Sequence, residues 1–401
     1  METQVKFPIP QVVYRRCREY QEMSPHPLPG SYLHQVIPLD VNLTDYWDYL
    51  NGIACEAIQA SMLGTRPPLR RFSVFLTDLC NLNCNYCRVD RSEARTMDLH
   101  WLMNSLPLAR KLGAIFFDVM GLGEPTLVPQ LPDLLQYASA LGFVVTFGTN
   151  GATSNLGDDD YLSRLMDVSA IKIRVSLDSA NPQQHDLERG SPPTWNKAVS
   201  FIERVLRVRA QRNIHAGVFI NKVVNNINIQ DAARDLDFFA ALGVDDVHLI
   251  PIRRVDHLLC TEDQILRYNM ETAPRIREIA YDKFLPWARE NAFIFGRDRG
   301  SIALASQGIY YHPQIASQCH ALRSQLLLDA CHHPYTCLWS KRNGGRSLLP
   351  EMGETIDIQE IWEKLGSIQY LQISPQVCNE LCTREIIQLN DSVEYTLMAL
   401  Q

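Results

Sequence analysis

The sequence of 401 residues contains no apolar stretch long enough to span a membrane as a helix. Positive charge is not in excess either, since 38 Lys and Arg residues stand against 45 Asp and Glu residues, for a formal net charge of -7. This balance argues against broad phosphate neutralisation on nucleic acid and against attraction to an anionic membrane surface. Repeats, low-complexity tracts and a signal-peptide layout are also missing. We therefore expect a cytoplasmic globular protein with no nucleic-acid or membrane partner.

Cysteine is plentiful, with eleven in the chain. In a reducing compartment we expect these cysteines to be metal ligands or core residues, not disulfides. Cys80, Cys84 and Cys87 have the spacing C-x3-C-x2-C, directly after the apolar run 72–76. Three thiolates can hold three corners of a cubane iron–sulfur cluster and leave the fourth iron open to a second molecule. A zinc site completed from elsewhere, or simple burial of the thiols, is the alternative.

Apolar strand-like runs alternate with helical patterns from about residue 70 onward. The predicted strands are 72–76, 115–120, 144–147, 171–176, 216–220 and 247–251. The predicted helices are 99–111, 130–140, 161–166, 196–210 and 229–241. Gly113, Gly142 and Gly243 follow three of these helices, where a left-handed cap is expected. Six successive βα units predict an α/β fold with a parallel sheet, forming a partial (β/α)6 barrel of the TIM type.

Polar and glycine-rich segments recur directly after these strands. They are residues 121–125 (Gly-Leu-Gly-Glu-Pro), 149–151 (Thr-Asn-Gly), 174–178, 221–222 and 251–254. Because parallel strands end at one edge of their sheet, and barrels build their sites at that edge, we expect these segments to surround one binding site. The sequence does not rank the candidates for a catalytic base, which are Asp118, Glu124, Lys222, Arg253 and Arg254.

The cysteine motif with Tyr86 before its third cysteine, together with 121–125 after the next strand, resembles the radical S-adenosylmethionine (SAM) superfamily over residues 72–254. The resemblance implies that Cys80, Cys84 and Cys87 hold a [4Fe-4S] cluster whose open iron chelates the amino and carboxylate groups of SAM. Leu122 stands where the family usually has glycine. The implied SAM contacts are Tyr86, Gly121, Gly123, Glu124, Pro125, Asn150, Ser176, Asp178, Arg189 and Ile250.

The tail is rich in cysteine again, and a predicted hairpin at 326–337 and helix at 358–364 lie among its thiols. This order resembles the auxiliary-cluster domains called twitch and SPASM, and implies a second [4Fe-4S] cluster. Its implied ligands are Cys319, Cys337, Cys378 and Cys382. His332 stands where the family has a glycine in the hairpin turn. Zinc bound by Cys331, His333, Cys337 and a distant cysteine is one alternative, and packed thiols are another.

Four parts of the chain follow from these patterns: an N-terminal arm and helical cap at 1–70, a radical SAM core at 71–255, a helical bridge at 256–310 and an auxiliary-cluster domain at 311–401. The resemblance implies reductive cleavage of SAM to a 5′-deoxyadenosyl radical, which takes a hydrogen atom from the substrate. A flavodoxin- or ferredoxin-type protein is the implied electron donor.

For the substrate we expect a small molecule such as a sugar, cyclitol or nucleoside, oxidised with help from the auxiliary cluster. The proline-broken first 70 residues show no obvious peptide-binding module, which favours this expectation. The alternative is a maturase that acts on a ribosomal precursor peptide. Two further alternatives are a redox-neutral lyase or isomerase and a non-catalytic iron–sulfur protein.

Overall fold

The computed structural model describes residues 60, 63–92, 94–212, 214–252, 255–284, 319, 323–335, 347–349 and 357–367. The chain divides into two units by its contacts. One consists of Pro68–Tyr310 with Gln325–Ser367, and the other of Met1–Pro67, Tyr311–Ser324 and Ile368–Gln401. The strands and helices named below belong to the first unit.

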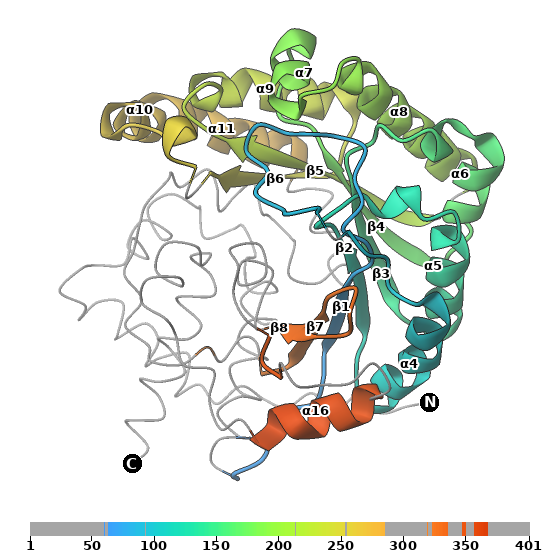
Figure 1. Ribbon diagram of the computed structural model, residues 1–401. Helices are drawn as coiled ribbons and strands as arrows, with labels where there is room; N and C mark the ends of the chain where they lie inside the picture. The colour runs from blue at the N-terminus through green and yellow to red at the C-terminus, as the bar shows by residue number, and fades with distance from the viewer. Residues whose placement is uncertain are drawn as a thin grey trace. The chain divides into compact units, whose positions relative to one another are not determined.

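An eight-stranded sheet forms the centre of this unit, in the order β6-β5-β4-β3-β2-β1-β7-β8 (Figure 1). Every neighbouring pair is parallel except β7 and β8, which are antiparallel. The strands are β1 (Arg71–Phe75), β2 (Phe116–Met120), β3 (Val144–Thr149), β4 (Ala170–Ser176), β5 (His215–Val224), β6 (Asp246–Pro251), β7 (Gln325–Leu328) and β8 (Pro334–Tyr335).

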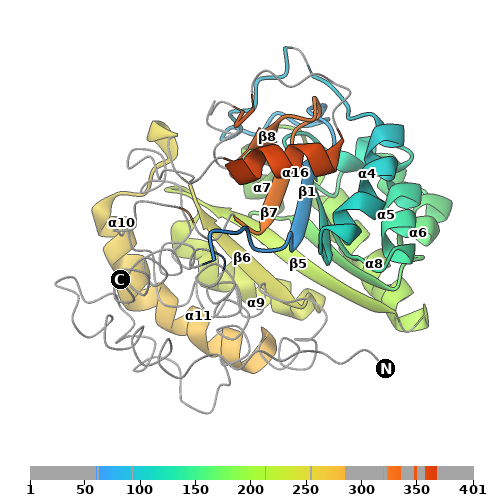
Figure 2. The same ribbon diagram turned by 90° about the horizontal axis from the view of Figure 1, so that it is seen from below.

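Helices connect the parallel strands and lie along the outside of the sheet (Figures 1 and 2). They are α4 (Leu99–Lys111), α5 (Leu131–Ala140), α6 (Asp159–Leu165), α7 (Pro182–Arg189), α8 (Thr194–Arg212) and α9 (Ala232–Leu242). Short 3-10 turns precede some of them, namely η1 (Pro125–Leu127), η2 (Asn155–Gly157), η3 (Ile229–Asp231) and η4 (Asp256–Leu258). Beyond β6 follow α10 (Glu262–Arg267), α11 (Ala273–Ile279) and, near the tail, α16 (Ile358–Ser367), with the π-helical segments η5 (Tyr268–Thr272) and η6 (Ala280–Phe284) flanking α11.

The two faces of the sheet differ in chemistry because strand side chains alternate in direction. One face presents Phe72, Val74, Phe117, Phe147 and Ile173, all with 0% exposure. Because this face is apolar, the strands could be predicted from apolar runs in the sequence. Register places polar side chains on the other face, where Ser73 pairs with Asp118 and Thr146 with Lys172.

The predicted α/β fold and its six parallel strands are confirmed, with ends that differ by up to four residues. All five predicted helices between them are present, and Gly113, Gly142 and Gly243 have the positive φ expected of left-handed caps. Helix α7 is not among the predicted helices. No described helix is both long and apolar enough to cross a membrane.

The tail hairpin extends the sheet beyond the six predicted strands. Strand β7 pairs in parallel with β1, and Leu327 and Tyr335 pack with Phe75 and Leu122. The sheet therefore continues from the core of the barrel into the tail. The glycine position of the turn is occupied by His332 with φ 67°, so this histidine adopts a conformation that glycine adopts more readily.

The second unit is described at few residues. Arg66 Nε donates to the carbonyl of Arg323 at 3.3 Å, and Arg323 Nη2 donates to the carbonyl of Thr65 at 3.1 Å. Cys319 is half-buried. The predicted arm and cap before residue 60, and Cys337, Cys378 and Cys382, lie outside the described residues.

The apolar face yields a stability prediction. Phe147 on β3 is fully buried between sheet and helices, so Phe147→Ala should lower the free energy of unfolding by about 3–5 kcal/mol. Leu187 is 66% exposed, and Leu187→Ala should change it by less than about 0.5 kcal/mol. Chemical denaturation of the full chain measures both. Equal losses would contradict the assignment of this face to the core.

Candidate functional site

The loops that follow the parallel strands meet at the carboxyl edge of the sheet, as predicted. The cysteine loop follows β1, residues 121–125 follow β2, Asn150 follows β3 and Asp178 follows β4. Hydrogen bonds between these loops join them into one site.

Residues 121–125 dock onto the backbone just before Cys80. Gly123 N donates to the carbonyl of Thr77 at 2.9 Å, and Glu124 N donates to the carbonyl of Leu79 at 2.7 Å. A Cβ on Gly123 would lie 2.1 Å from that Leu79 oxygen. Glycine is therefore required at this position, because the two backbones approach too closely for any side chain.

Glu124 holds the loops after β2 and β3 together. Its Oε1 accepts from Thr126 Oγ1 at 2.6 Å and from Thr149 Oγ1 at 2.7 Å, and its Oε2 accepts from Asn150 N at 2.6 Å. The residue is 2% exposed, and burial raises the pKa of its carboxyl despite these donors. The Glu124 carboxylate therefore joins two loops, and the assignment of Glu124 as a SAM contact stays a prediction.

Asn150 connects the loop after β3 to the first cysteine. Its Nδ2 donates to Asn81 Oδ1 at 2.8 Å and lies 3.9 Å from Cys80 Sγ, while its Oδ1 accepts from Ala152 N at 2.8 Å. Asn81 Nδ2 in turn lies 3.4 Å from the carbonyl of Ala152. This predicted site residue therefore lies beside a predicted cluster ligand.

Asp178 and Arg189 form the surroundings of the second cysteine. Arg189 Nε pairs with Asp178 Oδ2 at 2.7 Å, and its Nη1 lies 3.9 Å from Cys84 Sγ. Tyr86 OH also donates to Asp178 Oδ2, at 2.7 Å, and the Arg189 guanidinium lies 5.4 Å from the centre of the Tyr86 ring. Three predicted site residues are thus joined around a single carboxylate.

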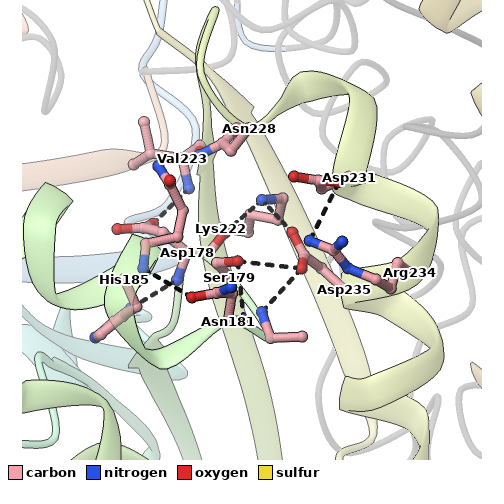
Figure 3. Close-up of polar contacts among 12 residues, drawn as sticks. Asp178, Ser179, Asn181, His185, Lys222, Val223, Asn228, Asp231, Arg234 and Asp235 are labelled. Atoms are coloured by element: carbon pink, nitrogen blue, oxygen red, sulfur yellow. Dashed lines mark hydrogen bonds and ion pairs between the residues drawn. The ribbon is translucent and has the colours of Figure 1, made fainter.

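Asp178 has 0% exposure, so its carboxylate has no open surface for a ligand. Its Oδ1 accepts from Val223 N at 2.9 Å, and its backbone N donates to His185 Nδ1 at 3.1 Å (Figure 3). Burial would raise the pKa of Asp178, but Arg189 and these donors hold it below its usual value. The carboxylate therefore positions Tyr86 and Arg189, and the assignment of Asp178 as a SAM contact stays a prediction.

Behind Asp178 lies a buried ion pair that sequence reasoning missed. Lys222 Nζ contacts Asp235 Oδ2 at 2.8 Å and also donates to the carbonyl of Asp178 (Figure 3). Asp235 Oδ1 accepts from Ala180 N at 2.8 Å and from Ser179 Oγ at 3.3 Å. Lys222 and Asp235 are both 0% exposed, so this pair ties β5 and α9 to the loop after β4.

Helix α7 packs against the cysteine loop through its last turn. Asn85 N donates to the carbonyl of Glu188 at 3.0 Å, and a Cβ on Gly190 would lie 2.3 Å from the carbonyl oxygen of Asn83. The Glu188 carboxylate is buried and accepts from the side-chain amides of Asn225 and Asn228. The loop after β5 therefore supports the loop that carries the cysteines.

The three thiols suit a group that carries positive charge. Burial raises the pKa of both the Cys80 and the Cys84 thiols, although Arg189 counteracts this at Cys84. Arg91 Nη2 lies 3.3 Å from Cys87 Sγ. Thiolates at this loop therefore need iron or another cation to be stable, and the loop fits a metal cluster.

A single zinc ion fits these cysteines less well than a cluster does. Among the described residues, one trio of ligand-type side chains has its atoms within 4.8 Å of one another, and it is not the trio of Cys80, Cys84 and Cys87. In a cubane each thiolate binds a different iron, so a wider separation of sulfurs is expected. Their assignment as cluster ligands stays a prediction.

The remaining predicted SAM contacts also lie at the carboxyl edge. Ser176 at the end of β4 and Ile250 near the end of β6 are half-buried, Gly121 is half-buried and Pro125 is buried. A Cβ on Gly121 would lie 2.5 Å from the carbonyl oxygen of Gly123.

None of the described candidates for a catalytic base is a free carboxylate or amine. Asp118 contacts Arg71 and Ser73 on the polar face of the sheet. Burial would raise its pKa, but Arg71 and two further cations hold it below the usual value, which makes Asp118 a weak base. Glu124 and Lys222 are engaged as described above. Arg253 and Arg254 lie outside the described residues.

Comparison with known proteins identifies the central part of the chain. Residues 74–249 match the family described as the radical SAM superfamily. The chain contains a radical SAM domain. Such a domain implies a [4Fe-4S] cluster and SAM, in agreement with the prediction from the cysteine motif.

Similar proteins with this domain have several activities in their names. The mycofactocin maturase MftC of Mycobacterium ulcerans is 30% identical, over 42% of this chain and 42% of its own. The AdoMet-dependent heme synthase of Methanosarcina barkeri is 26% identical, over 45% and 51%. The PqqA peptide cyclase of Streptomyces rochei is 29% identical, over 43% and 46%. The matched region thus spans about half the length of these relatives or less.

Among solved structures, Streptococcus suis SuiB bound to the precursor peptide SuiA is similar with a TM-score of 0.57. The likeness covers 84% of this chain and 75% of SuiB, at 14% sequence identity. At this identity the likeness concerns the fold, which is the radical SAM arrangement of a mostly parallel sheet with outer helices.

Gly123→Ala should abolish most of the iron binding at the cysteine loop, because the new Cβ would displace the backbone before Cys80. The measurement is iron per chain after anaerobic reconstitution, and the expected loss equals that of a Cys80/Cys84/Cys87 triple alanine variant. Gly157→Ala is the matched control, since no atom lies within 4 Å of its added Cβ. Wild-type iron content in Gly123→Ala would refute the proposed docking.

Lys222→Met should lower the free energy of unfolding by about 3–5 kcal/mol, because it leaves Asp235 charged and buried without its cation. Adding Asp235→Asn removes that charge and keeps an acceptor for Ala180 N. The double variant should therefore be more stable than Lys222→Met by about 1–3 kcal/mol. If the two substitutions instead have additive costs in denaturation experiments, the ion pair is not the stabilising element.

Proposed function

We propose that this chain is a radical SAM enzyme in which Cys80, Cys84 and Cys87 hold a [4Fe-4S] cluster. The observation that carries the proposal is the cysteine loop itself, with three thiols, cations beside Cys84 and Cys87, and glycine-dependent docking of 121–125 behind Cys80. The radical SAM domain at 74–249 supports it. The enzyme would also need one electron for the cluster, which a flavodoxin- or ferredoxin-type protein would supply.

The chain's own residues bind and orient the cofactor. When bound, the cluster and SAM supply one-electron cleavage of the sulfonium and a carbon radical that abstracts hydrogen. Arg189, held by Asp178, offers a cation beside Cys84 for the SAM carboxylate. Residues 121–125 would offer their backbone to the SAM amino group, and Ser176 and Ile250 would contact the ribose and adenine.

For the substrate we propose a ribosomal precursor peptide. The likeness to the PqqA peptide cyclase, at 29% identity over 43% of this chain, supports this choice. The fold shared with SuiB, which is described in complex with a precursor peptide, is compatible with it. The expectation of a small sugar, cyclitol or nucleoside drew on the proline-rich N-terminus, and the relatives favour the peptide alternative instead.

A small-molecule substrate is the second candidate, and the likeness to a heme synthase favours it. The auxiliary cluster at Cys319, Cys337, Cys378 and Cys382 is part of either proposal. Its role would be to accept the electron left on the oxidised substrate or to ligate the substrate.

The proposal predicts that the reconstituted enzyme, given SAM and a reductant, forms 5′-deoxyadenosine. Formation should rise at least tenfold when a precursor peptide that is a substrate is added, since substrate binding completes the site. Mass spectrometry of the peptide should show the loss of hydrogen that accompanies a new cross-link. Deuterium at the reacting carbon should appear in the 5′-deoxyadenosine.

The triple alanine variant of Cys80, Cys84 and Cys87 is the control, and it should form no 5′-deoxyadenosine. Turnover of SAM that is indifferent to the peptide, together with an unmodified peptide mass, would overturn the peptide substrate. Absence of SAM cleavage in the fully reconstituted wild type would overturn the enzymatic function as a whole.

A further inference from the structure

The turn between β7 and β8 brings together three side chains of metal-binding type. Asp329, Cys331 and His333 alternate along the turn, and their ligand atoms all lie within 4.8 Å of one another. His333 Nδ1 is 3.6 Å from Asp329 Oδ1. Tetrahedral zinc holds its ligand atoms about 3.5 Å apart, so only small side-chain movements would bring all three onto one ion.

The backbone holds this trio in place. Asp329 is 3% exposed, and its Oδ1 accepts from the backbone N of Cys331 and of His333, both at 2.9 Å. Between them, His332 stacks on Trp101 of α4 with ring centroids 3.9 Å apart. Because the intervening ring packs on the helix, Cys331 and His333 keep a fixed relation to Asp329.

A cation also lies beside the thiol. Arg95 Nη1 is 3.2 Å from Cys331 Sγ, and both Cys331 and His333 are half-buried. The arginine comes from the segment after the cysteine loop, so it is independent of the turn itself.

The strand pairing of the hairpin reaches the turn at Leu328 and Pro334. Within the described residues, Leu327 is in register with Tyr335 and Leu328 with Pro334, and Pro334 has no N–H to donate. A bound metal would close the turn at the point where the pairing ends.

We propose that Asp329, Cys331 and His333 form a zinc site in the β7–β8 turn. The combination of thiolate, imidazole and carboxylate suits Zn²⁺, whereas Ca²⁺ and Mg²⁺ prefer oxygen ligands alone. Three protein ligands leave the fourth position of the tetrahedron to water or to another side chain. The site is separate from Cys80, Cys84 and Cys87, and it does not depend on the proposed function.

The test uses the full chain reconstituted anaerobically with iron and sulfide, then exposed to Zn²⁺ and desalted. Zinc and iron are counted together by mass spectrometry. Cys331→Ser and His333→Asn should each bind about one zinc per chain less than wild type, with iron unchanged. Zinc X-ray absorption of the wild type should show one sulfur and otherwise nitrogen or oxygen neighbours.

Two control variants should keep the zinc. His257→Gln removes an exposed imidazole far from the turn in the sequence. Cys260→Ser removes a half-buried thiol elsewhere. Unchanged zinc in both Cys331→Ser and His333→Asn would overturn the proposal, as would three or four sulfur neighbours at zinc. Loss of iron from Cys331→Ser would also overturn it, because Cys331 would then be a cluster ligand.

Discussion

The geometry of the cysteine loop depends on one buried carboxylate, that of Asp178. An ionised group without exposure must find charged or hydrogen-bonding partners, because its desolvation is otherwise too costly. Asp178 takes them from three places: Tyr86 in the cysteine loop, Arg189 at the end of α7 and the backbone of Val223 in β5. The position of Arg189 beside Cys84 therefore follows from packing deep in the protein, and Lys222 with Asp235 secures that packing from behind.

The fold could be predicted from the sequence wherever the buried residues are apolar and lie close together in the chain. The strands were found because one face of each is filled with residues such as Phe117 and Phe147, and the helix ends because glycine adopts positive φ. Helix α7 shows the limit of this reading. Its buried residues are His185, Glu188 and Arg189, while its one large apolar residue, Leu187, is exposed, so hydrophobic periodicity carries no signal there. The capping signals of Asn181 and Pro182 were present and would have predicted its start.

Only the local motifs of the candidate site could be predicted from the sequence. Cys80, Cys84 and Cys87 can be recognised from their spacing. Asp235 and Asn228, in contrast, lie far along the chain from the groups that they support. Partner choice among buried polar groups is decided by tertiary packing, which leaves no periodic pattern in the sequence. The same reason applies to Asp178 and Glu124: a polar residue after a strand predicts the site, but the sequence does not show that these two carboxylates are buried.

The tail hairpin shows how far the site reaches along the chain. Without β7, strand β1 would be an edge strand, with unpaired backbone groups directly before the cysteine loop. Leu327 and Tyr335 also cover Phe75 at the end of β1 and Leu122 in the loop after β2. Leu122 stands at the position where the resemblance leads one to expect glycine, and its side chain packs in this cluster. Packing against the tail hairpin explains why leucine occupies this position. The loop after β2 and the hairpin therefore pack together as one unit.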